Sequence, residues 1–192
     1  MDRLFVACPL PDDITERLLA TTAGLPSEGV RITIRQNLHI TLFFIGEVPS
    51  EETPLIQEEL KKNLSGFEAF TLRLRGIEIK KTKQKPSMIW ARFGDSEPFS
   101  RLNSLIRSFL SSRMTQPPSH VNPVPHCTLA RIKKTDLGSW IPPAIEPFFI
   151  NVNRAELWLS RQSKDGVRYE KLSHTDFVPD IGNVIKDQAA GG

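Results

Sequence analysis

Two histidines in this chain are each followed by a threonine at the second position and a leucine at the third. The first pair is His39 with Thr41, and the second is His126 with Thr128. Both stand in short runs of apolar, β-branched and aromatic residues, which are typical of buried strands. Because side chains alternate between the two faces of a strand, each histidine shares a face with its threonine. We therefore expect one site built from two halves.

These residue types favour acid–base chemistry at a phosphate. The ordinary pKa of histidine, about 6.5, lets one imidazole accept a proton while a second donates one. The hydroxyls of Thr41 and Thr128 are suited to hydrogen-bond an anion lying between the two rings. The set suits displacement at phosphorus with an internal leaving oxygen, where proton transfer and charge stabilisation do most of the work.

Arg131 is a candidate for a bidentate charged contact with the same phosphate. Its odd offset from His126 places it on the opposite face of a regular strand. It joins the site only if the strand ends or bulges near Ala130.

The sequence predicts no metal site and no cofactor. It contains no carboxylate cluster, no HExxH motif, no glycine-rich phosphate loop and no cysteine–histidine spacing of the zinc type. We therefore expect metal-independent chemistry.

Structural interpretations compete with these functional ones. A lone histidine on a strand is usually a satisfied structural residue, but the repeated pattern favours catalysis for His39 and His126. His120 and His174 lack the pattern and are expected at the surface. Cys127 adjoins His126, but alternation turns it to the other face, which disfavours a cysteine nucleophile.

Two aromatic residues and one basic segment also have two interpretations. Phe5 and Trp90 are core residues in the simpler one, although either ring could stack on a base. The lysines between Lys80 and Lys85 are more often a solvated loop than an RNA contact. Beside an anionic cleft they would add attraction to a nucleic-acid backbone whatever its sequence.

Hydrophobic patterning predicts strands and helices in two similar halves, as in an α+β protein. The predicted strands cover residues 3–8, 30–34, 37–46, 70–79, 87–93, 125–131, 148–152, 155–161 and 167–172. The predicted helices cover about 12–24, 51–63 and 98–114, and a hairpin turn lies at 164–166. Residues 183–192 are expected to form a flexible C-terminal tail.

The composition is that of an ordinary globular protein. With 39% hydrophobic and 24% charged residues, the 192-residue chain suits one large domain or two closely packed lobes. The net charge of +3 points only weakly to an anionic partner. Cys8 and Cys127 lack disulfide or metal spacing, as expected of buried thiols in a reducing cytosol. No apolar run approaches the about 18 residues of a membrane span, so we expect a cytoplasmic monomer without a membrane partner.

At the motif residues the chain resembles the two-histidine phosphoesterase superfamily. Within it, the chain is similar to the RNA 2′,3′-cyclic phosphodiesterases once named 2′-5′ RNA ligases (LigT-like). The similarity covers nearly the whole chain and is carried by residues 3–7, 37–42, 44–48, 70–72, 89–90, 125–131, 156–160 and 168–169. It implies a bilobal α+β domain over residues 1–182. Two antiparallel sheets would flank a central cleft, with one motif from each lobe and helices on the outer faces.

The resemblance also implies an activity, the hydrolysis of a terminal 2′,3′-cyclic phosphate of RNA or a nucleotide to a 2′-phosphate. It implies that His39 is the proton donor to the departing 3′ oxygen and that His126 is the proton acceptor that activates water. Thr41, Thr128 and Arg131 would hold the phosphate. Joining of ends through a 2′-5′ bond would be the reverse reaction.

Two other functions stay open at this point. A non-catalytic module that binds RNA or nucleotides would keep the cleft, although binding alone has no need of both histidines. The same chemistry could also act on another cyclic phosphate, such as one on ADP-ribose, or on a 2′-5′ oligonucleotide. The sequence does not separate these substrates.

Overall fold

The structure is a computed structural model that describes residues 1–114, 124–133, 137–163 and 166–180. The chain begins with β1 (Asp2–Pro9), α1 (Asp12–Ala20), β2 (Val30–Ile32), the 3₁₀ turn η1 (Arg35–Asn37), β3 (His39–Val48) and α2 (Glu52–Leu64). It continues with β4 (Phe70–Thr82), β5 (Lys85–Phe93), α3 (Glu97–Leu110), the 3₁₀ turn η2 (Ser111–Arg113) and β6 (His126–Ile132). It ends with β7 (Phe149–Val152), β8 (Arg154–Ser163) and β9 (Gly166–Asp176). Among the described helices, none is both long and apolar enough to cross a membrane.

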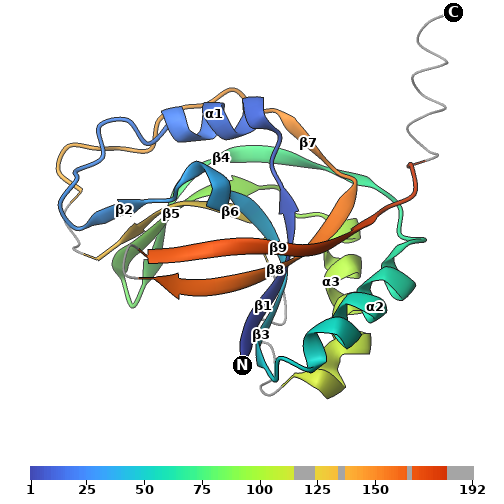
Figure 1. Ribbon diagram of the computed structural model, residues 1–192. Helices are drawn as coiled ribbons and strands as arrows, with labels where there is room; N and C mark the ends of the chain where they lie inside the picture. The colour runs from blue at the N-terminus through green and yellow to red at the C-terminus, as the bar shows by residue number, and fades with distance from the viewer. Residues whose placement is uncertain (115–123, 134–136, 164–165, 181–192) are drawn as a thin grey trace, which may run out of the picture.

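The strands form one curved antiparallel sheet with two halves (Figure 1). One half has the order β7-β4-β5-β6, with β2 also paired to β6, and the other has the order β3-β1-β8-β9. The halves meet where β6 pairs with β3, through Ile40 and Cys127. In Figure 1, helix α1 runs along the upper side of the molecule. Helices α2 and α3 lie together at the lower right, where α3 contacts β3 and α2 contacts β9. The predicted α+β fold is confirmed, and its two antiparallel sheets are continuous through this one pair.

Strand β3 departs from regular alternation because its register with β1 shifts twice. The shifts leave Leu42 and Ile45 as extra residues of β3 without partners in β1. The carbonyl oxygen of Leu42 accepts a 2.6 Å hydrogen bond from the buried side-chain amide of Asn103 in α3, so the helix satisfies the carbonyl at this bulge.

Gly46 has a φ of +94°, which glycine adopts without strain. The strand therefore runs on to Val48 instead of ending at Gly46 as predicted.

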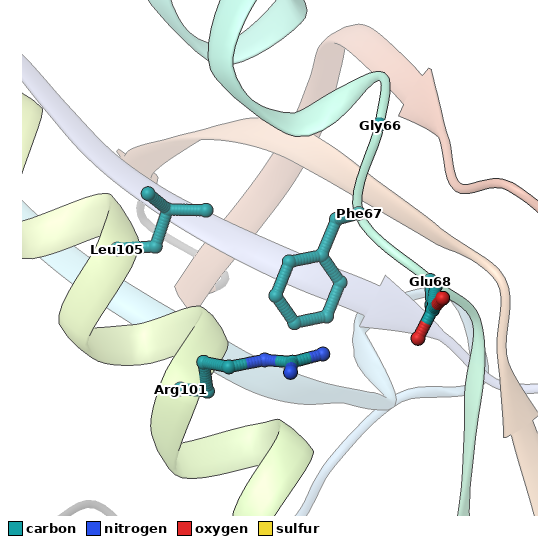
Figure 2. A pocket seen from close by; sticks show the side chains of 5 residues that line it. All are labelled: Gly66, Phe67, Glu68, Arg101 and Leu105. Atoms are coloured by element: carbon teal, nitrogen blue, oxygen red, sulfur yellow. The ribbon is translucent and has the colours of Figure 1, made fainter.

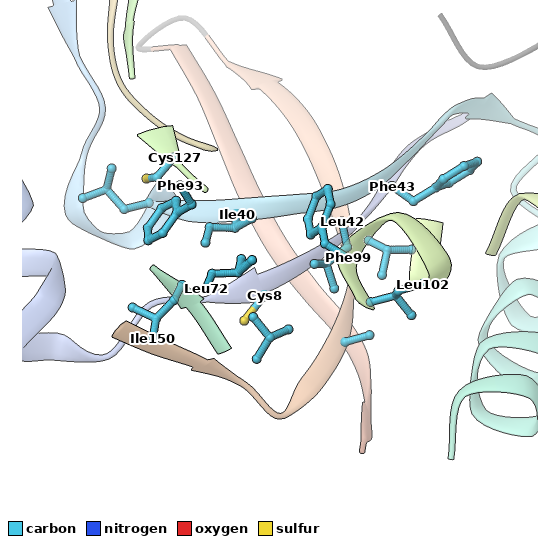
Figure 3. Packing of buried hydrophobic residues seen from close by; sticks show 14 of the residues in the cluster. Cys8, Ile40, Leu42, Phe43, Leu72, Phe93, Phe99, Leu102, Cys127 and Ile150 are labelled. Atoms are coloured by element: carbon cyan, nitrogen blue, oxygen red, sulfur yellow. The ribbon is translucent and has the colours of Figure 1, made fainter. Parts of the chain in front are cut away.

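One apolar cluster lies behind the sheet and joins its two halves. Figure 3 shows Ile40 and Leu42 of β3 beside Phe93 of β5 and Phe99 of α3. Cys127 is fully buried in this cluster. Burial raises the pKa of its thiol to about 12, so the sulfur stays protonated at neutral pH. The expectation that Cys127 faces away from His126 is confirmed.

The basic segment at residues 80–85 forms a hairpin and not the predicted loop. β4 continues to Thr82 and β5 begins at Lys85, so only Lys83 and Gln84 form the turn. Backbone pairing decides the structure here, since a ladder at an exposed tip needs no apolar side chains. The tail predicted at 183–192 and the surface position predicted for His120 lie outside the described residues. The domain boundary at residue 182 stays a prediction.

Candidate active site

The two predicted motifs lie side by side on antiparallel neighbours. The pair that joins β3 to β6, Ile40 with Cys127, is made of the residues between histidine and threonine in each motif. This register sets each histidine beside the threonine of the other motif. Ile40 and Cys127 are fully buried, whereas the four motif side chains are partly exposed on the other face. Diagonal neighbours in such a ladder are about 7–8 Å apart, which leaves room for a phosphate between the rings.

Both imidazoles are anchored in the same way. Nδ1 of His39 donates to the carbonyl oxygen of Asn37 at 2.7 Å. Nδ1 of His126 donates to the carbonyl oxygen of Val124, also at 2.7 Å. Because a carbonyl oxygen only accepts, Nδ1 carries the hydrogen in each neutral ring and Nε2 is the nitrogen that exchanges protons. The Thr41 hydroxyl donates to Nε2 of His39 at 3.0 Å.

Three aromatic rings surround His39. The centroid of its imidazole lies 5.0 Å from that of Phe5, 5.2 Å from that of Trp158 and 5.3 Å from that of Tyr169. Phe5 and Trp158 are buried and pack with Tyr169 in a small cluster on this side of the sheet, apart from the main core. The cluster fixes the orientation of His39 and keeps water from much of the ring.

The surroundings of His39 lower its pKa to about 4. Burial is the largest cause, and the charges of His126 and Arg131 lower the pKa further. The hydrogen bond to the Asn37 carbonyl acts in the opposite direction. Without a bound anion, His39 is therefore neutral at pH 7. The influence of His126 and Arg131 also indicates that both groups lie close to His39.

His126 has a different environment. Its ring stacks on the indole of Trp90, with centroids 3.7 Å apart and planes inclined by 22°. The Nζ of Lys80 lies 5.2 Å from the centroid of the same indole. Both Phe5 and Trp90, which the sequence left as core residues or stacking rings, contact a motif histidine.

Arg131 reaches the site face because β6 bulges. The ladder between β5 and β6 pairs Trp90 with Thr128 and Met88 with Arg131. The first strand advances by two residues between these pairs and the second by three, so β6 holds one extra residue, Leu129. Since cross-strand partners share a face, Arg131 lies on the same face as Trp90 and Thr128. The condition set by the sequence, a bulge near Ala130, is met.

A buried carboxylate supports the aromatic cluster around His39. Glu156 is 2% exposed and accepts a hydrogen bond from Nε1 of Trp158 at 2.9 Å. Two partly exposed cations neutralise it, with Nε of Arg154 at 3.0 Å and Nζ of Lys171 at 3.2 Å. Sequence reasoning assigned Glu156 and Trp158 no role. Their spacing of two on one strand was the available signal, because it places both on one face.

The remaining titratable candidates lie elsewhere. His174 is exposed on β9, as predicted, with Nε2 3.8 Å from a carboxylate oxygen of Asp176. In the described ranges no group of three or more His, Cys, Asp or Glu side chains is placed to hold a metal ion.

A hollow of about 410 Å³ is formed by the α2–β4 connection and α3 and contains no motif residue (Figure 2). The guanidinium of Arg101 lies 5.2 Å from the centroid of the Phe67 ring in this hollow. It is separate from the site formed by the two motifs.

Known proteins with similar sequences include cyclic phosphodiesterases. Residues 8–90 match the model of the family described as LigT like phosphoesterase. The RNA 2′,3′-cyclic phosphodiesterase of Thermus thermophilus is 35% identical over 150 residues, which cover 74% of each chain. The RNA 2′,3′-cyclic phosphodiesterase of Thermotoga maritima is 26% identical over 180 residues, which cover 91% of this chain and 95% of the relative.

Solved structures show a similar fold. The crystal structure of a Thermus thermophilus protein superposes with a TM-score of 0.72 at 26% identity. The superposition covers 91% of this chain and 97% of that one. Both halves of the sheet therefore have counterparts in a solved structure.

Proposed function

The chain belongs to the LigT-like phosphoesterase family, and from this premise we propose that it hydrolyses the 2′,3′-cyclic phosphate of RNA ends to a 2′-phosphate. One observation carries the proposal: the Ile40–Cys127 pair, which brings both motif histidines to one face, each beside the other motif's threonine. Two relatives that match 91% and 74% of the chain are named RNA 2′,3′-cyclic phosphodiesterases.

The two imidazoles divide the proton transfers. Nε2 of His126 takes a proton from water, and the water oxygen attacks phosphorus. The bond from phosphorus to the 3′ oxygen breaks, and Nε2 of His39 gives its proton to that oxygen. The products are a 2′-phosphate and a 3′-hydroxyl. If a 5′-hydroxyl took the place of water, the same steps would form a 2′-5′ bond. Ligation would then follow the forward path with a different nucleophile, and would not be the reverse of hydrolysis expected from the sequence.

Three further groups stabilise the phosphate. The hydroxyls of Thr41 and Thr128 flank the position between the rings, and the Arg131 guanidinium approaches along the same face. A guanidinium can bind two phosphate oxygens at once and is always charged. These groups oppose the charge that develops on the oxygens in the transition state.

Because the pKa of His39 is low in the free site, the acid step depends on the bound substrate. At a pKa of about 4 the ring is neutral in the free site and cannot act as an acid at pH 7. A phosphate anion beside Nε2 stabilises the imidazolium and raises this pKa. The acid is then formed where the substrate is bound.

The test is turnover of an RNA oligonucleotide with a 2′,3′-cyclic end in the presence of EDTA, with the product identified as the 2′-phosphate. His39→Ala and His126→Ala should each abolish most of the activity, while the exposed control His174→Ala should leave it unchanged. Activity that requires a metal, or that survives both site substitutions, would contradict the proposal. Tight binding without any product would instead favour the non-catalytic module.

We also propose that the enzyme is a cytoplasmic monomer. Both halves of the site come from one chain, so no second copy is needed to complete it. Cys8 and Cys127 are buried free thiols, which suit a reducing compartment. Light scattering of the purified chain tests the monomer.

A further inference from the structure

A row of basic side chains crosses the sheet beside the motif residues. On β5 the row is at Met88, two residues from Trp90, the partner of Thr128. In the ladders, Lys80 pairs with Met88, Met88 with Arg131, and Arg131 with Arg31. Cross-strand partners place their side chains on the same face. The row therefore runs over β4, β5, β6 and β2, and its three cations are exposed.

This row shares the face of the catalytic groups. Met88 and Trp90 are two residues apart on β5, so their side chains point the same way. Trp90 stacks on His126, and Nζ of Lys80 lies 5.2 Å from the centroid of the indole. Nη1 of Arg131 lies 3.6 Å from the sulfur of Met88. The row and the reacting phosphate are thus neighbours.

The spacing fits a polynucleotide. Two residues along a strand span about 6.6–6.8 Å, which is of the order of one nucleotide step along an extended single strand. The row lies two residues of β5 from the Trp90–Thr128 pair and four residues from the Arg92–His126 pair. From a phosphate held between the histidines, the next phosphodiester of an extended strand would therefore reach toward the level of the row.

Arg31, at one end of the row, lies against another part of the sheet. The Arg31 guanidinium lies where a side chain at Gly166 would project, so Arg31 spans from β2 to the β8–β9 hairpin. Figure 1 shows this hairpin and the β4–β5 hairpin at the same end of the molecule. Arg31 is thus held at the hairpin, whereas Lys80 is the end of the row that lies over Trp90, the ring stacked on His126.

The β4–β5 hairpin holds Lys80 in place. Its two-residue turn, Lys83 and Gln84, has φ values of 48° and 63°, the left-handed conformation of tight hairpin turns. The Ser87 hydroxyl donates to the carbonyl oxygen of Lys80 at 3.0 Å and accepts from Thr82 at 3.0 Å. The backbone that carries the lysine is fixed before any ligand binds.

We propose that Lys80 binds the phosphodiester that precedes the terminal nucleotide, so that the enzyme recognises the end of an RNA strand over a free cyclic mononucleotide. This inference rests on the proposed hydrolysis. The contact is with the backbone charge, so it is independent of base sequence.

The experiment compares kcat/KM for three substrates. They are a nucleoside 2′,3′-cyclic phosphate, a dinucleotide with a 2′,3′-cyclic end, and the same dinucleotide with an uncharged methylphosphonate as its internal linkage. The wild-type enzyme should prefer the charged dinucleotide over the other two. Lys80→Gln should lower this preference by roughly three- to tenfold. It should also reduce the slope of log kcat/KM against log salt concentration by about 0.7.

Lys81→Gln is the matched control. Lys81 is the next residue of the same strand and is also exposed, and alternation points it to the opposite face. It should leave the preference as in the wild type. Equal kcat/KM for all three substrates, or equal effects of the two lysine substitutions, would overturn the subsite and leave the proposed hydrolysis standing. Failure to turn over any of the three would overturn the proposed hydrolysis itself.

Discussion

The two halves of the site carry the same motif in different surroundings. His39 is enclosed by three aromatic rings on the β3 side, and its pKa is lowered to about 4. His126, on the β6 side, stacks on one indole that a lysine also contacts. The local anchoring by a carbonyl two residues earlier is the same in both. In the proposed mechanism, the division into acid and base therefore comes from the neighbouring strands and not from the motif.

The largest expected effect separates the two histidines by leaving group. His39→Ala and His126→Ala should each lower kcat on a 2′,3′-cyclic phosphate about 10²- to 10⁴-fold. On a phosphodiester with a p-nitrophenyl leaving group, which departs without a proton, His39→Ala should regain most of the loss and His126→Ala should not. Steady-state kinetics on both substrates checks this. Equal losses on both substrates would show that the halves do not divide the roles in this way.

A smaller loss of kcat/KM is expected on substitution of Arg131, a residue that only the β6 half of the site supplies. Arg131→Gln removes a charged contact to the phosphate, worth about 1.5–3 kcal/mol or about 10- to 150-fold in kcat/KM. Arg131→Lys keeps the charge and should recover part of the loss, because an ammonium cannot make the bidentate contact. An unchanged kcat/KM in Arg131→Gln would remove Arg131 from the phosphate site.

The support of the β3 side can be tested through stability. Glu156→Leu leaves the buried indole N–H of Trp158 without an acceptor, which should lower the free energy of unfolding by about 1–3 kcal/mol. Glu156→Gln retains an acceptor oxygen and should cost less. Urea unfolding followed by tryptophan fluorescence measures both. If the two substitutions destabilise equally, the hydrogen bond to Trp158 is not what the carboxylate provides.

The smallest expected effect is a shift in the pKa of His39, which NMR titration measures. In the free protein the ring should titrate with a midpoint near pH 4, since burial and two positive neighbours disfavour the imidazolium. Saturation with inorganic phosphate should raise the midpoint, because an anion favours the charged ring. Arg131→Gln should raise it in the free protein, since one positive charge is removed. A midpoint near 6.5 in the free wild type would mean that the ring is solvated and that the asymmetry is absent.

Alternation along a strand predicted much of the site. It placed each histidine with its threonine and turned Cys127 toward the core, and the structure agrees. The position of Arg131 could be stated only as a condition, because a bulge depends on how β6 pairs with β5. The segment Lys80–Lys85 was predicted as a loop because its residues are highly charged. It is a hairpin because its backbone pairs with another polar segment, which a hydrophobic pattern does not reveal.

The sequence by itself determined which residues share a face wherever a strand is regular, since that follows from the two-residue period of the extended chain. It also determined the available chemistry, since that follows from the side-chain types. The tertiary structure decided which strands are neighbours. It joined β3 to β6 at the central residues of the motifs, placed Glu156 and Trp158 behind one histidine, and brought a row of cations beside the other. These are contacts between segments far apart in the chain, and they arise from packing one curved sheet around a common core, which no local pattern encodes.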